Sequence, residues 1–265
     1  MTDPLRTVVK VARGHGLPTS DPLVLRDLTN LIVHLRPAPV VARVQLTLGA
    51  LRGRAWAETE IDAALFLAPS GCADRAAGPR CRPRTARGGR HARHLLAARR
   101  PRSRARRAVA AGRSLRELHD AFAAYEGELP TCDRLSEVRG LVVDPELRAL
   151  AERLPPLEGA PIHGDAHLRN VLWSPRGPLW SDLENICRGP REFDLACLRF
   201  RPLPESDAAI AAYGDHDGEE IERALMYVTL FLAAVTPLVA ERAGDEGKAE
   251  AQRRIERALG YARAP

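Results

Sequence analysis

Residues 70 to 107 contain almost nothing that a protein core could bury, and this interruption limits the folds open to the chain. The segment, SGCADRAAGPRCRPRTARGGRHARHLLAARRPRSRARR, has only Leu95 and Leu96 as large aliphatic residues and no aromatic residue. Folding requires enough buried apolar surface to offset the loss of chain entropy. We therefore expect two separately packed parts, residues 1–107 and 108–265, with disorder or poor packing over 70–107.

The positive charge of the chain is concentrated in the same segment. It holds 13 arginines and one acidic residue, Asp74, or +12, so the other 227 residues carry −6 of the total charge of +6. Three interpretations are a nucleic-acid-binding arm, a disordered insertion, or a stretch translated out of frame between two compensating shifts. The lack of aromatic side chains for base stacking disfavours the first. The abrupt loss and return of apolar periodicity favours the third, which predicts a strand-like peptide in another reading frame of the coding DNA.

The overall composition is that of a globular protein, with 45% hydrophobic and 28% charged residues. The five cysteines form no CxxC pair, so they fit neither a disulfide framework nor a structural zinc site and favour a reducing, cytoplasmic location. The N-terminal sequence has no apolar run typical of a signal peptide. The most membrane-like stretch, 224–240, has 17 residues and is short for a bilayer span. We therefore expect a buried core helix there and no membrane association.

The apolar pattern predicts strands in the first part of the chain and helices in the second. Residues 23–35 and 40–48 are rich in β-branched and aliphatic side chains, and the Arg-Pro-Ala-Pro turn at 36–39 joins them as antiparallel strands. Apolar residues near helical spacing predict a helix over 56–68. The other expected elements are a helix from 108, a helix beginning at Asp144 and Pro145, short strands around 161–173 and 179–183, and helices over 219–240 and 246–262.

The residues that carry chemistry gather in the sequence IHGDAHLRNVLWSPRGPLWSDLENICRGPREFDLA, over 162–196. Asp165 and Asn170 have the D-x-x-x-x-N spacing of kinase catalytic loops, where the aspartate meets the acceptor hydroxyl and the asparagine binds magnesium. Asp182 follows a short apolar strand that can place its carboxylate beside Asn170, and magnesium prefers oxygen ligands. The spacing therefore predicts a site for magnesium and a nucleotide.

His163 and His167 allow a competing interpretation, because together with Asp165 they form a period-two set of the kind that can bind zinc. We favour the magnesium site, since zinc would leave the downstream asparagine and aspartates without a role. The two histidines are then expected to hydrogen-bond the backbone and fix the position of Asp165. For Glu184, metal binding and an ion pair remain equal alternatives.

This region resembles the aminoglycoside phosphotransferase and choline kinase-like family, whose pattern is an H-G-D-x-H-x-x-N loop, a D-x-[DE] strand and a downstream D-L-A. The chain matches these pieces in order, with HGDAH at 163–167 followed by Asn170, DLE at 182–184, and DLA at 194–196. The resemblance implies that Asp165 is the catalytic base and that Asn170 and Asp182 hold magnesium. It also implies that Asp194 braces the catalytic loop from the following helix.

The resemblance extends to the first part of the chain. Residues 40–44, VVARV, resemble the strand whose basic residue reaches the nucleotide phosphates, with Arg43 in place of the usual lysine. Glu60 stands where the family's helix supplies an acid to pair with that residue. Residues 115–119, LRELH, resemble the helix that enters the second lobe. A G-x-G-x-x-G loop is absent, because RDLTN at 26–30 occupies the equivalent hairpin.

The resemblance implies an α/β (α+β) protein kinase-like fold, with a small β-rich nucleotide-binding lobe and a larger, mostly helical catalytic lobe. It implies an enzyme that uses ATP and Mg²⁺ to phosphorylate a hydroxyl of a small molecule, such as an aminoglycoside or another metabolite. An inactive relative with a disrupted nucleotide pocket is one alternative, and an Arg-rich nucleic-acid-binding protein is another. A set of acidic residues after the site could meet a cationic acceptor, although we favour solvated helix starts for them: Glu205, Asp207, Asp215, Asp217, Glu219 and Glu220.

Overall fold

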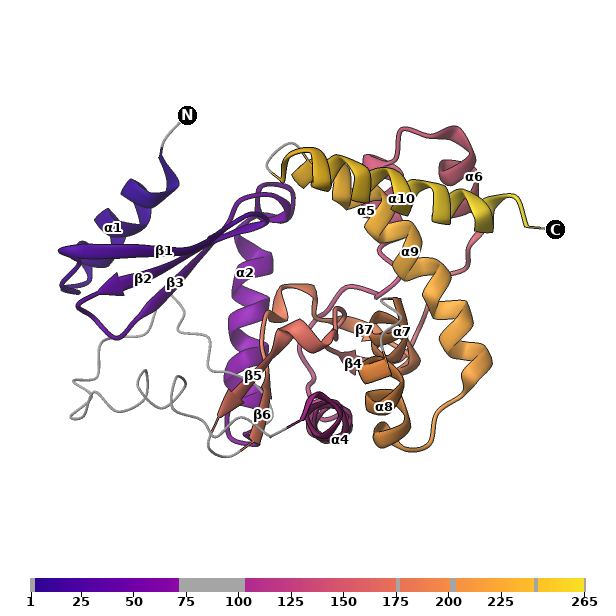
Figure 1. The fold of residues 1–265 in the computed structure, drawn as a ribbon, viewed down its shortest axis with the longest axis horizontal. Coiled ribbons are helices and arrows are strands. Elements are labelled where there is room, and N and C mark those ends of the chain that lie inside the picture. The colour runs from indigo at the N-terminus through magenta and orange to yellow at the C-terminus, as the bar shows by residue number, and fades with distance from the viewer. Residues whose placement is uncertain (1–2, 72–102, 175–176, 201–203, 241–242, 265) are drawn as a thin grey trace. The chain divides into compact units, whose positions relative to one another are not determined.

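The computed structural model describes residues 3–71, 103–174, 177–200, 204–240 and 243–264 (Figure 1). The chain forms two compact units, one holding the described residues up to Ala57 and the other those from Glu58 onward. Most of the Arg-rich segment, residues 72–102, lies outside the described residues. The interpretations of that segment, and the lobe division at residue 107 that depends on it, stay predictions.

The first unit is a helix packed on a three-stranded antiparallel sheet. Helix α1 (Pro4–Gly14) follows Asp3, whose side chain accepts a hydrogen bond from the N–H of Leu5 at 2.9 Å and so caps the helix. The strands are β1 (Asp21–Asp27), β2 (Asn30–Arg36) and β3 (Val41–Gln45), in the spatial order β1-β2-β3. Alternate residues of β2 point to one face of the sheet. These are Leu31, Val33 and Leu35, which are buried with Ala12 of α1 in one apolar cluster.

The predicted sheet is present, but it contains one strand more than the apolar pattern suggested, because the hairpin that the family resemblance placed at 26–30 joins β1 to β2. The apolar run 23–35 is divided by a polar turn at 28–29, where the N–H of Leu28 donates to the carbonyl of Asn30 at 3.4 Å. The turn at 36–39 joins β2 to β3 as predicted. Helix α1 was not predicted, although Leu5, Val8 and Ala12 have helical spacing and pack in the same apolar cluster as the sheet.

Helix α2 (Leu48–Leu67) covers all but the last residue of the helix predicted over 56–68, and it begins earlier than expected. Gly53 interrupts it with φ 70° and ψ −169°, a backbone conformation that glycine adopts without steric penalty. The division between the two units falls within α2, after Ala57. In the second unit, α2 buries Glu60 and an apolar set made of Ala63, Ala64 and Leu67.

The second unit is mostly helical, and two packings organise it: α4 lies against α8, and α9 lies against both α7 and α10 (Figure 1). Helix α4 starts four residues before the predicted position, because the hydroxyl of Ser103 accepts a hydrogen bond from the N–H of Arg106 at 3.3 Å. The predicted cap at Asp144 is confirmed, since Oδ1 accepts from the N–H groups of Glu146 and Leu147 at 2.9 and 3.2 Å. The helices are α4 (Arg104–Phe122), α5 (Leu135–Leu141), α6 (Pro145–Arg153), α7 (Glu192–Phe200), α8 (Pro204–Tyr213), α9 (Gly218–Ala240) and α10 (Gly244–Ala262).

Helix α9 contains the stretch that the sequence analysis assigned to the core. Within the described part of the chain it is the one helix long and apolar enough to cross a membrane. Most of its apolar window is buried inside the protein, and residues such as Ile221, Leu225 and Leu230 pack in the interior. The packing of α9 is therefore that of a core helix.

Short strands and single helical turns occupy the middle of the second unit. They form two antiparallel pairs, β4 with β7 and β5 with β6. The β5–β6 hairpin also lies against α4. In chain order the elements are β4 (Ala160–Ile162), η1 (Leu168–Asn170), β5 (Val171–Ser174), β6 (Gly177–Trp180), η2 (Leu183–Asn185) and β7 (Cys187–Gly189).

Candidate active site

The short strand pairs bring the polar motif residues together. Strand β4 ends directly before His163, and η1 ends at Asn170, directly before β5. Strand β6, the partner of β5, ends just before Ser181, whose N–H and hydroxyl both donate to the carbonyl of Asn170 at 2.9 Å. Asp182 is the next residue, so its backbone lies next to the Asn170 segment, and its charge contributes to raising the pKa of the Asp165 carboxyl.

Asp194, in the first turn of α7, is fully buried and holds the backbone of the HGDAH loop (163–167). Its Oδ2 accepts from the N–H of His163 and its Oδ1 from the N–H of Gly164, both at 2.8 Å. Nε2 of His119 lies 2.9 Å from Oδ2. Burial alone would raise the pKa of Asp194, but the hydrogen bonds from His119 and from the loop outweigh burial and lower it. The carboxylate is therefore kept ionised where the loop needs an acceptor.

Both ring nitrogens of His163 form hydrogen bonds with the backbone. Nε2 lies 3.0 Å from the carbonyl of Ser181, so Nε2 carries the proton, and Nδ1 accepts from the N–H of Asp165 at 3.3 Å. The ring is fully buried, edge-on to Trp180 with centroids 5.5 Å apart. This arrangement leaves no nitrogen of His163 for zinc. Across the described ranges, no group of three or more His, Cys, Asp or Glu residues could hold a metal ion.

Gly164 is required at its position by both conformation and space. Its φ is +76°, and a Cβ there would lie 1.9 Å from the carbonyl oxygen of Asn185. We expect Gly164→Ala to lower the free energy of unfolding by about 1–3 kcal/mol from backbone strain alone, and by more because a carbonyl must move. Denaturant unfolding of the purified variant measures the loss.

Gly140 provides the matched control, since it lies in α5 and a Cβ there meets nothing within 4 Å. Gly140→Ala should leave the free energy of unfolding unchanged or raise it by up to about 1 kcal/mol, because alanine has the higher helix propensity. Equal stability of the two variants would show that the loop does not need glycine at 164.

Asp165 presents its carboxylate to the pocket beside the loop. The side chain is 32% exposed, and Nε2 of His167 lies 3.8 Å from Oδ2. Desolvation raises the pKa of Asp165 to about 6, and the negative charge of Asp182 contributes to the increase. A carboxyl group with this pKa is ionised at neutral pH and is a stronger proton acceptor than an ordinary aspartate.

The remaining predicted residues lie in both units. Glu184, in η2, is 8% exposed. Arg43 lies on β3 of the first unit, paired across the sheet with Ile32, whereas Glu60 lies on α2 in the second unit and is 6% exposed. Their interaction with each other or with a nucleotide stays a prediction.

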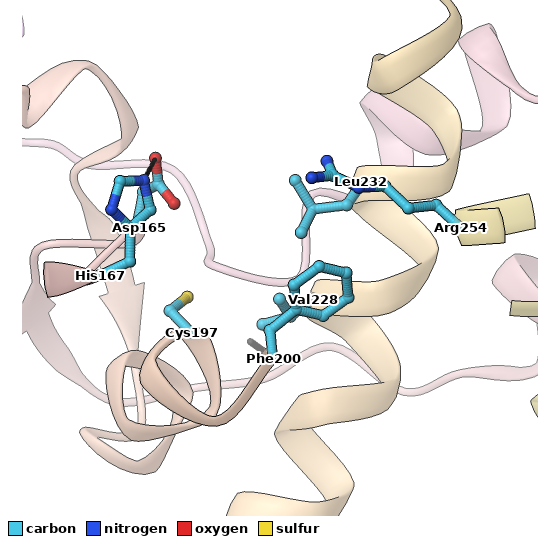
Figure 2. Close-up of a pocket in the computed structure, with 7 residues that line it drawn as sticks. All are labelled: Asp165, His167, Cys197, Phe200, Val228, Leu232 and Arg254. Atoms are coloured by element: carbon cyan, nitrogen blue, oxygen red, sulfur yellow. Dashed lines mark ion pairs between the residues drawn. The ribbon is translucent and has the colours of Figure 1, made fainter. Parts of the chain in front are cut away.

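A pocket of about 100 Å³ opens beside Asp165, entirely within the second unit (Figure 2). The HGDAH loop supplies Asp165 and His167, and the other walls come from α7, α9 and α10. The lining residues from those three helices are Cys197, Phe200, Val228, Leu232 and Arg254. The candidate base therefore faces a small cavity with a largely apolar wall.

The sequence profile of the phosphotransferase enzyme family matches residues 61–227, which is well over half of the chain. The chain belongs to this family. The matched range contains the whole HGDAH to DLA region, so the predicted resemblance is confirmed. No curated protein sequence gives a significant match.

Solved structures of other phosphotransferases have the same fold. Choline kinase LicA from Streptococcus pneumoniae superposes with a TM-score of 0.66 at 14% identity, covering 98% of this chain and 100% of that chain. Amicoumacin kinase hAmiN, in complex with AMP-PNP and Ca²⁺, superposes with a TM-score of 0.60 at 11% identity, covering 97% of this chain and 93% of that chain. The GDP complex of aminoglycoside 2'-phosphotransferase-IIIa gives 0.54 at 15% identity, covering 98% and 99%. These likenesses confirm the predicted kinase-like fold, with a small β-rich region followed by a helical one.

The sequence analysis did not identify His119 and Tyr213 as residues that support the site. His119 of α4 joins Asp194 to Tyr213 of α8, because its Nδ1 lies 2.8 Å from the Tyr213 hydroxyl. The segment 115–119 had been singled out, but only as a helix resembling the entry to the second lobe. The partners of His119 are 75 and 94 residues away along the chain, and no local spacing connects them.

Proposed function

We propose that this protein transfers the γ-phosphoryl group of ATP to a hydroxyl group of a small molecule, with Asp165 as the catalytic base. Membership of the phosphotransferase family supports the class of reaction. The observation that carries the assignment of the base is the position of Asp165. Its carboxylate faces a cavity, while its own N–H and the N–H groups of the two residues before it are held by hydrogen bonds.

In this proposal Asp165 accepts the proton of the acceptor hydroxyl as that oxygen attacks phosphorus. The held backbone matters because a base must stay within hydrogen-bond reach of the proton that it removes. His163 and Asp194 are then positioning residues, since both act on the loop rather than on substrate. His167, beside Oδ2 of Asp165, orients the carboxylate.

Asn170 and Asp182 would hold the magnesium ion. The side-chain nitrogen of Asn170 donates to the carbonyl of Asp165 at 3.0 Å, which fixes the amide and leaves its oxygen as the ligand. One amide oxygen and one carboxylate suit Mg²⁺, which binds to few protein oxygens and completes its shell with water and phosphate. When bound, the ion neutralises charge on the phosphates. Glu184 remains a candidate for metal binding or an ion pair.

The nucleotide phosphates would be met by Arg43, oriented by Glu60. A guanidinium can bind phosphate or carboxylate through two parallel hydrogen bonds, so an arginine can serve where kinases usually have lysine. The solved relatives include GDP and AMP-PNP complexes, which supports a nucleotide as phosphoryl donor. There are two alternatives, an inactive relative and an Arg-rich nucleic-acid binder. Both predict that replacing Asp182 leaves nucleotide binding unchanged.

The test is the thermal unfolding midpoint with and without MgATP. Ligand at about 100 times its Kd adds about 2.7 kcal/mol, which corresponds to roughly 5–10 °C for a protein of this size. We expect that rise only when both ATP and Mg²⁺ are present. Asp182→Asn should abolish the magnesium-dependent part.

Asp207→Asn serves as the matched control, because Asp207 is an exposed carboxylate at the start of α8 and lines neither the loop nor the pocket. It should keep the full rise. No rise in the unmodified protein would favour the inactive relative, and binding to nucleic acid that weakens steeply with salt would favour the Arg-rich binder.

A further inference from the structure

The pocket beside Asp165 has an apolar floor and one cationic group. Figure 2 shows Phe200 of α7 and Val228 of α9 below the opening, with Leu232 and Arg254 on the side opposite Asp165 and His167. The only carboxylate in this lining is Asp165, which the proposed reaction uses for the hydroxyl proton. Arg254 is therefore the one lining residue whose charge is available to a second group of the acceptor.

Arg254 is rigidly held with part of its hydrogen-bonding capacity unused. Its side chain is 12% exposed, its Nε donates to Glu250 at 2.8 Å, and its Nη1 donates to the Thr236 hydroxyl at 2.8 Å. The guanidinium also lies over the ring of Phe200, 5.4 Å from the centroid. A guanidinium has five N–H donors. The three that remain make no hydrogen bond to any described residue and can serve a ligand.

The charge around Arg254 is not cancelled by its ion pair. Glu250 is shared, because it also accepts from Arg253 at 2.7 Å, so two guanidinium groups face one carboxylate. An outer groove continues from Arg254, and its lining holds three arginines and two glutamates: Arg169, Glu246, Ala249, Glu250, Arg253 and Arg254. The arginines of this groove lining therefore outnumber its glutamates by one, and Asp165 adds a negative charge on the opposite side of the pocket.

The acidic residues that the sequence analysis considered for a cationic acceptor lie elsewhere. Glu205 and Asp207 are in the first turn of α8, and Glu219 and Glu220 are in the first turn of α9. Asp217 caps α9 by accepting from the N–H groups of both of those glutamates. None of the six lines the pocket or the outer groove. Solvated helix starts, the interpretation we favoured, agree with these positions.

We propose that the acceptor is a small hydroxy carboxylate, bound through its carboxylate by Arg254 and through its carbon skeleton by Phe200, Val228 and Leu232. This inference rests on the proposed function. In the reaction the hydroxyl oxygen bonds to the γ-phosphorus, the bond from that phosphorus to the β,γ-bridging oxygen breaks, and ADP leaves with that electron pair. The hydroxyl proton passes to Asp165. A cavity of about 100 Å³ suits a short molecule, since sites for drug-sized ligands span roughly 300–1,000 Å³.

A single guanidinium matches the single charge of a carboxylate, and its fork matches the two carboxylate oxygens. A cation such as choline, or a polycationic aminoglycoside, would instead be repelled by Arg254 and would meet no carboxylate in the pocket lining other than Asp165. The substrate class therefore differs from that named for the similar choline kinase and aminoglycoside phosphotransferase structures.

The experiment compares hydroxyl acceptors of similar chain length that carry different charges. Glycolate, ethylene glycol, ethanolamine and choline form one series, and γ-hydroxybutanoate, butanediol and aminobutanol form a longer one. Turnover is followed as ADP release with product identified by phosphorus NMR, and binding of each acceptor to the full-length protein is measured by calorimetry without nucleotide. We expect the hydroxy acids to bind and react best. Arg254→Gln should lower their kcat/KM relative to the diols by about 10- to 100-fold.

The acid-to-diol ratio within one variant does not depend on how much of that variant is folded, so a loss of stability cannot imitate the effect. Arg263→Gln is the matched control, because Arg263 follows α10, pairs with Glu146 at 2.7 Å and lines neither cavity. It should keep the ratio. Glycerol phosphate is included as a dianion.

Several results would overturn the inference while the proposed function stands. These are a preference for the cations, the diols or glycerol phosphate, an acid-to-diol ratio unchanged in Arg254→Gln, or no binding of hydroxy acids to the unmodified protein. Failure of the proposed function is recognised separately, because it removes the MgATP-dependent rise in unfolding temperature, a measurement made without any acceptor.

Discussion

Replacing Asp165 with asparagine is expected to lower kcat by about 10²- to 10⁴-fold, the usual contribution of general base catalysis. An amide has nearly the same shape as a carboxyl group but cannot take the hydroxyl proton. Nucleotide binding should be unchanged, because Asn170 and Asp182, rather than Asp165, are assigned to the metal. ADP release and the MgATP-dependent unfolding temperature measure the two properties on the same sample.

The pKa of Asp165 allows its role as the base to be tested a second way, through the pH dependence of activity and of stability. With a pKa of about 6 in the folded protein, the base is protonated as pH falls, so kcat/KM for MgATP should decline below about pH 6. The folded pKa lies above the ordinary value of 3.8, so the ionised group destabilises the fold and stability falls as pH rises from about 4 through 6. Asp165→Asn should therefore raise the unfolding temperature at pH 8 and have no such effect at pH 4.

Asp120→Asn is the control for this pair of measurements. Asp120 is an exposed carboxylate on α4 that pairs with Arg116 at 3.2 Å, away from the pocket lining. Its substitution should leave kcat and the acidic limb unchanged. Full turnover in Asp165→Asn, or a decline at the same pH in that variant, would refute the assignment of the base.

Replacing Asp194 with alanine is expected to produce the largest loss of stability. The substitution leaves the N–H groups of His163 and Gly164 and the ring of His119 without their acceptor, deep in the second unit. Removing one partner from a buried charged pair typically costs about 3–5 kcal/mol, which lowers the unfolding temperature by on the order of 10 °C. Activity should fall as well, because the loop that carries Asp165 loses its support.

A double-mutant cycle with His119→Ala separates the interaction between His119 and Asp194 from a general loss of stability. If His119 acts through Asp194, His119→Ala should lower the free energy of unfolding by at least about 1 kcal/mol less when residue 194 is already alanine than when it is aspartate. Where Asp194→Ala does not fold, Asp194→Asn, which keeps one acceptor oxygen, completes the cycle. Asp207→Ala, at an exposed position on α8, should stay within about 0.5 kcal/mol. Additive losses at 119 and 194 would contradict a coupled network.

Part of this architecture could be predicted because the signals are local. The cap of α6 depends on Asp144 and on N–H groups two and three residues away, and the amide of Asn170 reaches back only to the carbonyl of Asp165. The sheet of the first unit was partly misjudged. The apolar pattern treated 23–35 as one strand, although RDLTN at 26–30 is largely polar, and the pairing of β1 with β2 across that stretch divides it.

The sequence by itself determined the motif, its order and the local turns, because backbone geometry over a few residues depends on which residues are neighbours in the chain. Only the tertiary structure decided that His119 and Tyr213 stand behind Asp194, and that Arg254 faces the pocket of Asp165. These side chains come from α4, α8 and α10. Their proximity results from how helices pack side by side, which depends on the shape of whole buried faces rather than on any spacing along the chain.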